Sequence, residues 1–431
     1  MNGAPLAIPK SKAEIEALQR RQKRLAVERA KRSAFWADRL ADINLEKLDD
    51  PAEWQKIPIL HKEELRQLSA AEFYRDFCHA PKTDYAEYWR SGGSTGKPLF
   101  YPRTKEDLRY NMLGFTRTFT CMGIAAGTSA HLSFPLGIHP AGHMWARAGE
   151  IMNIAMAWVG AGNSAPSQVQ LELIDMLRPD LWMGMSSYGL HLANLAEAGD
   201  HDLRASSVDR ILCTAEPLSM AKRQKLERMW GADVYDAFGM TEISMMGAEA
   251  GTAGELHVWT DLAYIEVVDP ETYAPVAPGD PGALVVTSLF GNNCTPFLRW
   301  FSGDIVSYQE EGSSDSPLSI FPVIRHAHRT AGFFKIRGVN INHAELEDLM
   351  FDDAAIGDFK AVAVNDGGLD DLRLSIEISK GRDAAQVAAQ VSRKVKSVFE
   401  ITPVIEQLPV GTLALEFETT VKAPRFADQR E

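Results

Sequence analysis

Short apolar runs alternate with longer amphipathic segments between about residues 105 and 291. The apolar runs are bounded by turn-forming residues and predict strands over residues 130–134, 154–159, 181–185, 210–214 and 232–235. The segments between them carry apolar residues at three- and four-residue spacing and predict helices over residues 167–177, 188–196 and 219–229. Strands that alternate with helices are typical of parallel α/β layers. We therefore predict an α/β fold for this part of the chain.

The pattern changes twice further along the chain. Apolar runs at residues 264–268 and 283–288 flank the turn-rich residues 269–282, which predicts an antiparallel arrangement. The polar segment 309–317 (QEEGSSDSP) predicts a loop. After residue 330, an α+β pattern begins, with strands predicted over residues 333–336, 359–364 and 372–378 and helices over residues 344–350 and 384–399. We place a domain boundary near residues 330–332, between a large N-terminal domain (1–330) and a small C-terminal domain (331–431).

Composition narrows the class of protein. A chain of 431 residues is long for a single hydrophobic core, and its net charge of −13 argues against a nucleic-acid partner. The basic residues 20–32 lie in a predicted helix that Ser11 and Glu14 open, and they are expected to form its solvated face.

The most apolar run, residues 151–162, is shorter than the roughly 20 residues of a membrane span and predicts a buried strand. With no apolar signal segment at the N-terminus, we predict a cytoplasmic protein without a membrane partner.

The cysteines indicate neither zinc nor disulfides. Cys78, Cys121, Cys213 and Cys294 are far apart in the sequence, whereas structural zinc sites and disulfide frameworks use closely spaced or patterned cysteines. We expect free thiols in a reducing compartment.

Two segments carry candidate chemistry. Residues 91–98 (SGGSTGKP) are small and polar, so that the backbone can fold around a phosphate and donate hydrogen bonds to it. They are not a Walker A loop, which would need glycine at position 91 and serine or threonine at position 98, and an ordinary turn has a similar composition. Residues 236–242 (DAFGMTE) are predicted to form a loop directly after a strand, the position at which α/β sheets bind ligands. There Phe238 could stack on a base and Glu242 could hold Mg²⁺, although aromatic residues more often fill a core.

Together with other motifs, these segments resemble a known superfamily. Residues 91–98, 215–217 (AEP), 236–242 and 303–304 (GD) occur in the order found in acyl-CoA synthetases, nonribosomal adenylation domains and luciferases. Within that superfamily the chain is similar to the phenylacetate–CoA ligase family. The narrower resemblance lies in residues 215–217, Leu298 and Arg299, residues 337–340 (RGVN), residues 422–425 (KAPR), Asp428 and Arg430. It covers the chain from about residue 15 to its C-terminus.

The resemblance implies a role for each matched residue. The phosphate loop for the β- and γ-phosphates of ATP would consist of Ser94, Thr95, Gly96 and Lys97. The nucleotide would further be bound by Ala215, Glu216, Pro217, Asp236 and Phe238 around adenine and by Asp304 and Arg329 at the ribose. Thr241 would contact the α-phosphate, Glu242 would hold Mg²⁺ and Lys422 would be the mobile catalytic lysine. Coenzyme A would be the co-substrate.

The carboxylic acid is less well specified. Alignment with the acyl-binding segments of the family implies a pocket formed by Phe134, Leu136, His139, His143, Trp145, Tyr188, Ala237, Gly239 and Met240. These residues are bulky and include histidines, which favours a small aromatic or short, hydroxylated acid over a long acyl chain. No general base is required, because a carboxylic acid is already ionised near pH 7.

Two departures from the family are visible. The hinge between the domains usually carries an acidic residue where this chain has Ala331, followed by Gly332, and a glycine where it has His328. Residues 309–317 lack the cysteines with which some relatives bind zinc, so we predict no structural zinc.

The predicted function is ATP-dependent activation of a small carboxylic acid as acyl-AMP, followed by thioester formation with coenzyme A. Two alternatives remain open: transfer of the acyl group to a carrier-protein thiol or an amine, and a non-catalytic nucleotide-binding homologue. A homodimer also remains open.

Overall fold

The computed structural model describes residues 6–91, 98–199, 201–251, 254–291, 293–313, 316–329, 333–366, 369–416 and 425–430. The chain forms two compact units, each made from several segments. The first unit comprises Met1–Ala126, Gly137–Asn153 and Tyr235–Thr330, and the second comprises Gly127–Leu136, Ile154–Val234 and Ala331–Glu431. Residues 1–330 thus contribute to both units, and the division at residue 330 stays a prediction.

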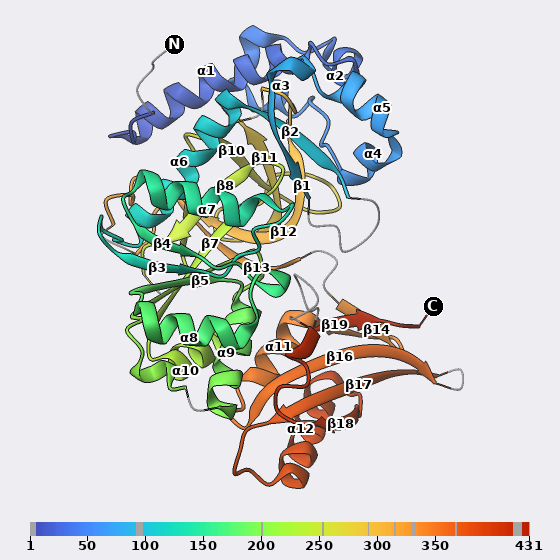
Figure 1. Ribbon diagram of the computed structural model, residues 1–431. Helices are drawn as coiled ribbons and strands as arrows, with labels where there is room; N and C mark the ends of the chain where they lie inside the picture. Colours follow the sequence, from blue (N-terminus) through green and yellow to red (C-terminus); the bar gives the residue numbers. More distant parts are fainter. Residues whose placement is uncertain are drawn as a thin grey trace. The chain divides into compact units, whose positions relative to one another are not determined.

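Helices form the N-terminal part of the first unit (Figure 1). They are α1 (Lys12–Ala30), α2 (Ala34–Ala37), α3 (Pro51–Trp54), α4 (Lys62–Gln67), α5 (Ala70–Glu72), α6 (Lys105–Cys121) and α7 (Pro140–Ile151). Ser11 caps α1 by accepting a hydrogen bond from the Glu14 amide, as the sequence indicated. The basic face of α1 is not wholly solvated: Lys23 is 8% exposed, and its ammonium lies 4.2 Å from the ring centroids of Trp54 and Tyr264.

An antiparallel run of strands completes the first unit. Its strands are β7 (Asp233–Met240, which enters this unit at Tyr235), β8 (Ser244–Glu249), β9 (Leu256–Val258), β10 (Ala263–Val268), β11 (Pro281–Ser288), β12 (Trp300–Gln309) and β13 (Val323–Arg329). They pair in the order β10-β11-β12-β13-β9-β8-β7. The predicted antiparallel pair is confirmed, because β10 and β11 are in register from Ala263 opposite Ser288 to Val268 opposite Ala283. A separate hairpin joins β1 (Tyr85–Arg90) to β2 (Phe100–Thr104).

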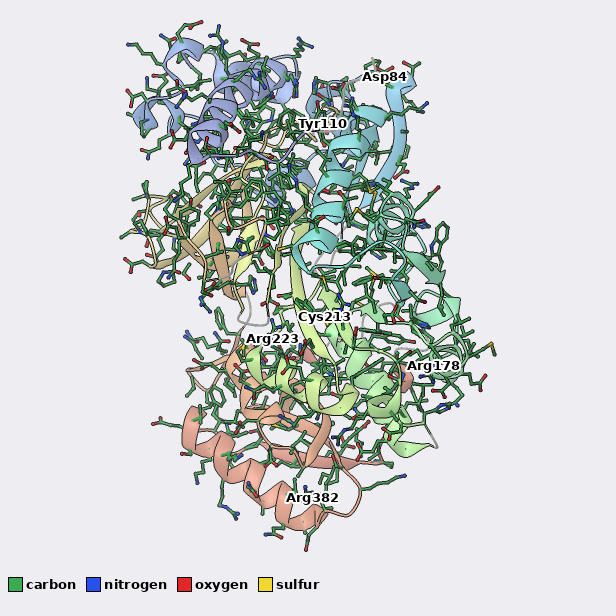
Figure 2. All side chains as sticks on the ribbon, turned by 90° about the vertical axis from the view of Figure 1, so that its left-hand side faces the viewer. Asp84, Tyr110, Arg178, Cys213, Arg223 and Arg382 are labelled. Carbon is green, nitrogen blue, oxygen red and sulfur yellow. The ribbon has the colours of Figure 1, made fainter. Side chains whose placement is uncertain are left out.

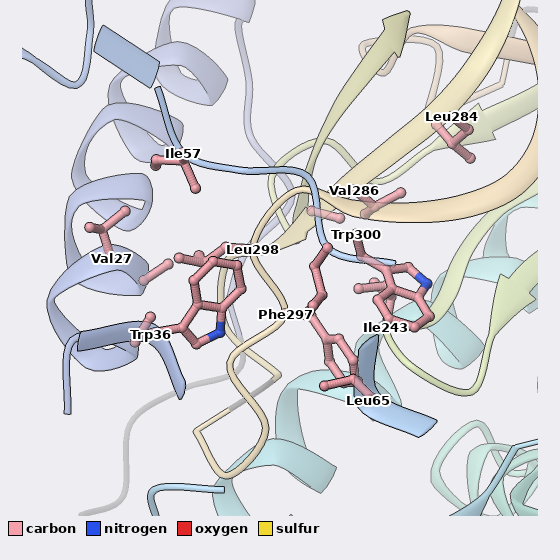
Figure 3. Packing of buried hydrophobic residues seen from close by; sticks show 14 of the residues in the cluster. Val27, Trp36, Ile57, Leu65, Ile243, Leu284, Val286, Phe297, Leu298 and Trp300 are labelled. Atoms are coloured by element: carbon pink, nitrogen blue, oxygen red, sulfur yellow. The ribbon is translucent and has the colours of Figure 1, made fainter. Parts of the chain in front are cut away.

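The core of the first unit lies between these strands and the N-terminal helices (Figure 3). Val27 of α1 and Trp36 of α2 face Leu298, while Leu284 and Val286 of β11 contribute from the sheet. Because Trp36 is fully buried, its indole N–H needs a partner, and it donates to the Pro296 carbonyl at 2.9 Å.

Parallel strands and three helices form the body of the second unit. The strands β3 (Ser129–Leu132), β4 (Ala155–Trp158), β5 (Leu181–Gly184) and β6 (Arg210–Thr214) pair in the order β6-β5-β3-β4. They alternate along the chain with helices α8 (Ser167–Leu177), α9 (Ser186–Ala198) and α10 (Met220–Trp230), drawn in green in Figure 1. The predicted parallel α/β layers are therefore confirmed here. The expectation of a buried strand within residues 151–162 is wrong, since β4 lies at the edge of the sheet and Trp158 is 57% exposed.

The remainder of the second unit begins after residue 332. It contains the hairpin β14 (Phe333–Ile336) and β15 (Val339–Asn342), the strands β16 (Ile356–Asp366), β17 (Leu369–Ile378), β18 (Val404–Leu408) and β19 (Phe426–Asp428), and the helices α11 (His343–Phe351) and α12 (Ala384–Phe399). The sheet order is β18-β17-β16-β19. Helix α12 buries a stripe with four-residue spacing, Val387, Val391, Val395 and Phe399, which is the pattern that predicted it.

Two sequence expectations concern redox state and membranes. All four cysteines are buried and free. Within the described ranges, every helix is too short or too polar to cross a lipid bilayer.

A buried ion pair ties α6 to the turn between β9 and β10. Arg117 and Asp261 are 5% and 0% exposed and join in two hydrogen bonds, of 2.6 and 2.8 Å. Asp261→Ala would leave a buried guanidinium without its counter-charge, so it should lower the free energy of unfolding by about 3–5 kcal/mol. Urea denaturation measures this, and the exposed pair of Arg24 and Glu46 supplies the control: Arg24→Ala should leave the unfolding midpoint unchanged. Equal midpoints for both variants would contradict the prediction.

Candidate active site

The turn that follows β7 carries most of the predicted catalytic residues. The sequence indicated a loop over residues 236–242, but β7 continues to Met240 and pairs with β8, so the turn itself occupies only residues 241–243. Gly239 makes this tight return possible, because a Cβ there would lie 2.6 Å from the Ser244 carbonyl oxygen and 2.9 Å from the Met245 Cα. The hairpin therefore requires glycine at position 239, whether or not Gly239 also lines the predicted acid pocket.

The Glu242 carboxylate is buried within this turn at 5% exposure. Its Oε1 accepts a hydrogen bond from the Tyr101 hydroxyl at 2.9 Å and lies 3.1 Å from the Lys62 ammonium. Burial raises the pKa of Tyr101 well above its usual value, and the charge of Glu242 raises it further, so this phenol stays protonated and donates. The sequence had singled out neither Tyr101 nor Lys62.

Arg103 fixes the backbone of the same turn. It is 0% exposed and donates to the carbonyl oxygens of Thr241 and Glu242 at 2.7 and 2.8 Å and to the Thr295 hydroxyl at 2.9 Å. Its guanidinium also lies 4.8 Å from the Trp89 ring centroid. The position of Arg103 on β2, directly after the glycine-rich segment, was the signal that could have drawn attention to it.

The glycine-rich segment connects β1 to β2. Ser91 closes the base of this hairpin, where its backbone N–H donates to the Leu99 carbonyl and its hydroxyl accepts from the Leu99 amide. Ser91 also bonds the Tyr101 side chain, which partly offsets the rise in the pKa of Tyr101. The predicted phosphate-binding residues Ser94, Thr95, Gly96 and Lys97 lie outside the described residues.

Two of the predicted nucleotide-binding residues of the first unit, Asp304 and Phe238, both lie next to a histidine, His326. Asp304 is 8% exposed, and its Oδ1 lies 3.4 Å from Nε2 of His326. The His326 ring lies 5.8 Å from the ring of Phe238, with 36° between their planes. The structure thus brings Phe238 and Asp304 together through His326, which sequence reasoning missed. The backbone of Arg329 is in register with Asp304, but its side chain lies outside the described part.

The first unit also contains predicted acid-pocket residues. Ala237 and Met240 lie on β7, on either side of Gly239. His143 is exposed, and its Nε2 lies 3.0 Å from the Gly137 carbonyl oxygen. His139 occupies the N-cap position of α7 without a side-chain capping bond, and its Nε2 lies 3.3 Å from a guanidinium nitrogen of Arg90. Trp145 instead packs in the core, edge-on to Phe115 and Phe119.

In the second unit, the segment predicted to line adenine follows β6. Cys213 lies near the end of β6 and Arg223 on α10 (Figure 2), and Ala215 turns the chain between them with a φ of 71°. The Glu216 carboxylate accepts hydrogen bonds from the Ser187 amide (3.0 Å), the Ser187 hydroxyl (2.7 Å) and the Ser186 hydroxyl (3.2 Å) at the start of α9. The Pro217 carbonyl accepts from Lys222 at 3.1 Å.

One of the three predicted acid-pocket residues of the second unit, Tyr188, belongs to a buried polar network. Phe134 is fully buried and Leu136 partly buried. Tyr188 is 1% exposed, and its hydroxyl lies 2.8 Å from the Gln170 amide nitrogen and 3.1 Å from the Ser167 hydroxyl. Gln170 also binds Ser133 (2.6 Å) and the Gly160 carbonyl (2.6 Å), so this network holds Tyr188 in one orientation.

A magnesium ion that arrives with ATP suits the Glu242 carboxylate. Mg²⁺ in such sites binds one or two carboxylates and completes its coordination with phosphate oxygens and water. Glu242 is a buried hard-oxygen donor, and Lys62 beside it would add a second positive charge. Among the described residues, no group of three His, Cys, Asp or Glu side chains is arranged to hold a metal by itself. Lys422 lies outside those residues.

The fold and the motifs place the chain among the adenylate-forming enzymes. The AMP-binding enzyme family matches residues 10–290, and the chain belongs to that family. The resemblance inferred from the motifs is thereby confirmed.

Comparisons with individual proteins show which members of the family the chain resembles. The chain is similar to the phenylacetate-coenzyme A ligases of Thermus thermophilus (25% identity, 83% of each chain) and Aromatoleum evansii (25% identity, 97% of this chain and 96% of the relative). In fold it resembles 2-hydroxyisobutyryl-CoA ligase in the postadenylation state with R3-HIB-AMP (TM-score 0.85, 23% identity, 100% of this chain and 94% of that chain). The same enzyme in the thioesterification state with 2-HIB-AMP and CoA gives a TM-score of 0.69. These likenesses confirm the predicted fold class and the predicted class of AMP-forming acid–CoA ligases.

We predict that Glu242→Gln weakens the Mg²⁺ dependence of acyl-AMP formation and slows that step by at least about 100-fold, as expected when a charge that stabilises the transition state is lost. The amide can still accept a hydrogen bond from Tyr101, so the turn should persist. Acid-dependent release of pyrophosphate, titrated with Mg²⁺, measures the effect. Glu255→Gln is the control, because Glu255 is a partly buried carboxylate that, like Glu242, pairs with a basic side chain, here that of Arg325. An unchanged magnesium titration of Glu242→Gln would remove Glu242 from the metal site.

A second prediction concerns Asp304. Asp304→Ala should raise the KM for ATP about 10- to 150-fold, the change that corresponds to one lost hydrogen bond to a charged group, and should raise the KM for the acid much less. Asp304→Asn keeps an acceptor oxygen and should fall between the parent and the alanine variant. Equal increases of both KM values would mean that Asp304 supports the local fold and does not bind the nucleotide.

Proposed function

We propose that the chain activates a small carboxylic acid with ATP to form an acyl-AMP and pyrophosphate, and then transfers the acyl group to coenzyme A with release of AMP. The observation that carries this proposal is the turn at residues 241–243. It combines a buried carboxylate, a neighbouring ammonium and a backbone held by a buried guanidinium, next to the strand that leaves the glycine-rich segment.

The first step brings two anions together. The substrate carboxylate attacks the α-phosphorus of ATP, the bond from that phosphorus to the bridging oxygen breaks, and the electron pair leaves with pyrophosphate. Mg²⁺ held by Glu242 would offset the charge that grows on the phosphates. Thr241 would donate to the α-phosphate, and Lys97 and Lys422 would supply positive charge near the leaving group. Asp304 would accept hydrogen bonds from the ribose hydroxyls, and Phe238 with His326 would flank the base.

The second step needs a different arrangement at the same carbonyl carbon. The thiol sulfur of coenzyme A attacks the acyl-AMP, its proton passes to solvent, and AMP leaves. Because pyrophosphate must depart before the thiol can enter, we propose that residues 331–431 form a module that presents Lys422 for the first step and another face for the second. The hinge residues Ala331 and Gly332 lie outside the described residues.

The acid is proposed to be small and aromatic, or short and hydroxylated. Two similarities support this class: the relatives are phenylacetate-coenzyme A ligases, and the structural neighbour is a 2-hydroxyisobutyryl-CoA ligase. Within the second unit, the Tyr188 hydroxyl is held by Gln170 and Ser167, so it offers a polar group in a fixed position on α9. One chain carries the full set of motifs, so the proposed chemistry does not require a second copy. It is equally compatible with the homodimer that the sequence leaves open.

The acceptor distinguishes this proposal from its closest alternative. A panel of aromatic and short hydroxylated acids with ATP and Mg²⁺ should release pyrophosphate, and coenzyme A should convert the bound acyl-AMP to a thioester that chromatography detects. Pyrophosphate release without any thioester would favour transfer to a carrier-protein thiol or an amine. No acid-dependent pyrophosphate with any acid would favour a nucleotide-binding homologue without this activity.

Lys422 provides a test of the two-step scheme. We predict that Lys422→Ala loses acyl-AMP formation but still converts a chemically supplied acyl-AMP to its thioester, because only the first step needs the additional positive charge. Rapid-quench measurement of each half-reaction checks this. Lys394→Ala changes a lysine of the same module that pairs with Asp353 at 3.6 Å, and should alter neither step. Parental acyl-AMP formation by Lys422→Ala would refute the assignment.

A further inference from the structure

Helix α10 presents two buried lysines to the part of the second unit that follows residue 332. Lys225 is 4% exposed, and its ammonium donates to the carbonyl oxygens of Ile356 and Gly357, at 2.7 Å for Gly357. Lys222 is 3% exposed and lies 2.8 Å from the Glu347 carboxylate of α11. Lysines on a helix normally keep their charge in water, so two buried ones with partners in another segment mark a specific docking contact.

The carbonyl groups that Lys225 binds lie immediately before Asp358. The Asp358 carboxylate accepts hydrogen bonds from Arg425 Nε at 3.0 Å and from the Phe359 amide at 2.8 Å. Arg425 is 9% exposed, and its backbone carbonyl accepts from the Ala361 amide at 2.7 Å where β19 starts to pair with β16. Lys225 and Arg425 also lie 4.8 and 5.0 Å from the Phe351 ring centroid. Helix α10 is thus linked through Phe351 and Asp358 to Arg425.

Charge balance supports this linkage. Burial by itself lowers the pKa of Arg425, but the carboxylates of Asp358, Glu347 and Glu216 outweigh it and raise the pKa above its usual value. Burial lowers the pKa of Lys225 to about 7, yet an uncharged amine keeps two N–H groups for its two carbonyl acceptors, so the contact does not depend on the charge. Lys222 further joins Glu347 to the Pro217 carbonyl, within the segment predicted to line adenine.

Arg425 follows Lys422 by three residues in the sequence, so whatever fixes Arg425 limits where Lys422 can reach. We propose that Lys222 and Lys225 of α10 are positioning residues for acyl-AMP formation: they dock α11 and β16, and through Asp358 and Arg425 they anchor the segment that carries Lys422. This inference rests on the proposed function. It assigns to α10 a role in the first half-reaction only, because the second half-reaction does not use Lys422.

The test separates the two half-reactions in Lys225→Met, which keeps the length of the side chain and removes its donors. Because both hydrogen bonds to the Ile356 and Gly357 carbonyl groups are lost, acyl-AMP formation should slow at least about tenfold, whereas thioester formation from supplied acyl-AMP should keep its parental rate. Glu347→Gln is a second, milder variant, which removes the carboxylate charge that pairs with Lys222. It should also slow acyl-AMP formation and leave thioester formation at the parental rate. The thermal unfolding midpoint of each variant shows whether it folds.

A pairwise test and a control complete the design. If Lys222 and Glu347 act through their mutual contact, Lys222→Met combined with Glu347→Gln should slow acyl-AMP formation no more than Lys222→Met alone. Lys394→Met removes an ion pair that lies wholly among residues 353–394 and should leave both half-reactions unchanged.

Three results for Lys225→Met and Glu347→Gln would overturn the inference: equal losses in both half-reactions, a loss confined to thioester formation, or no loss at all. Failure of the proposed function itself is distinguishable, because the parent protein would then release no acid-dependent pyrophosphate.

Discussion

The buried guanidinium of Arg103 is the contact on which the candidate active site depends. A hairpin turn by itself leaves the carbonyl groups of Thr241 and Glu242 without partners, and a buried carbonyl without a hydrogen bond is costly. Arg103 satisfies both, and its position on β2 ties the turn to the strand that leaves the glycine-rich segment. The Glu242 carboxylate can therefore be buried beside Tyr101 and Lys62 without losing its orientation.

In each unit, a buried ion pair joins segments that are far apart in the sequence. Arg117 and Asp261 join α6 to a turn of the sheet in the first unit, and Lys222 and Glu347 join α10 to α11 in the second. A buried ion pair contributes little net stability compared with apolar residues, but breaking one is expensive because the remaining charge is left without a partner. Such pairs therefore specify one arrangement, which is the property that docking of a catalytic segment requires.

The sequence predicted secondary structure best where a regular repeat was present. Helices α8 and α12 begin and end within one residue of their predicted limits, because their buried residues recur at helical spacing. The prediction is wrong at β4, where the apolar run predicts a buried strand although the strand lies at the edge of its sheet with Trp158 exposed. It also placed a loop where β7 continues to Met240, since local composition does not reveal a partner strand such as β8.

By itself, the sequence determined the family, because its short motifs occur in the family's order although the chain is only about 25% identical to its relatives. Tertiary structure alone decided which side chains support those motifs. Lys62, Tyr101 and Arg103 are each at least 139 residues from Glu242 in the chain, and His326 is 88 residues from Phe238, so no local pattern could connect them. Hydrogen bonds and charge pairs of this kind depend on distances of a few ångströms in space, which only the folded chain establishes.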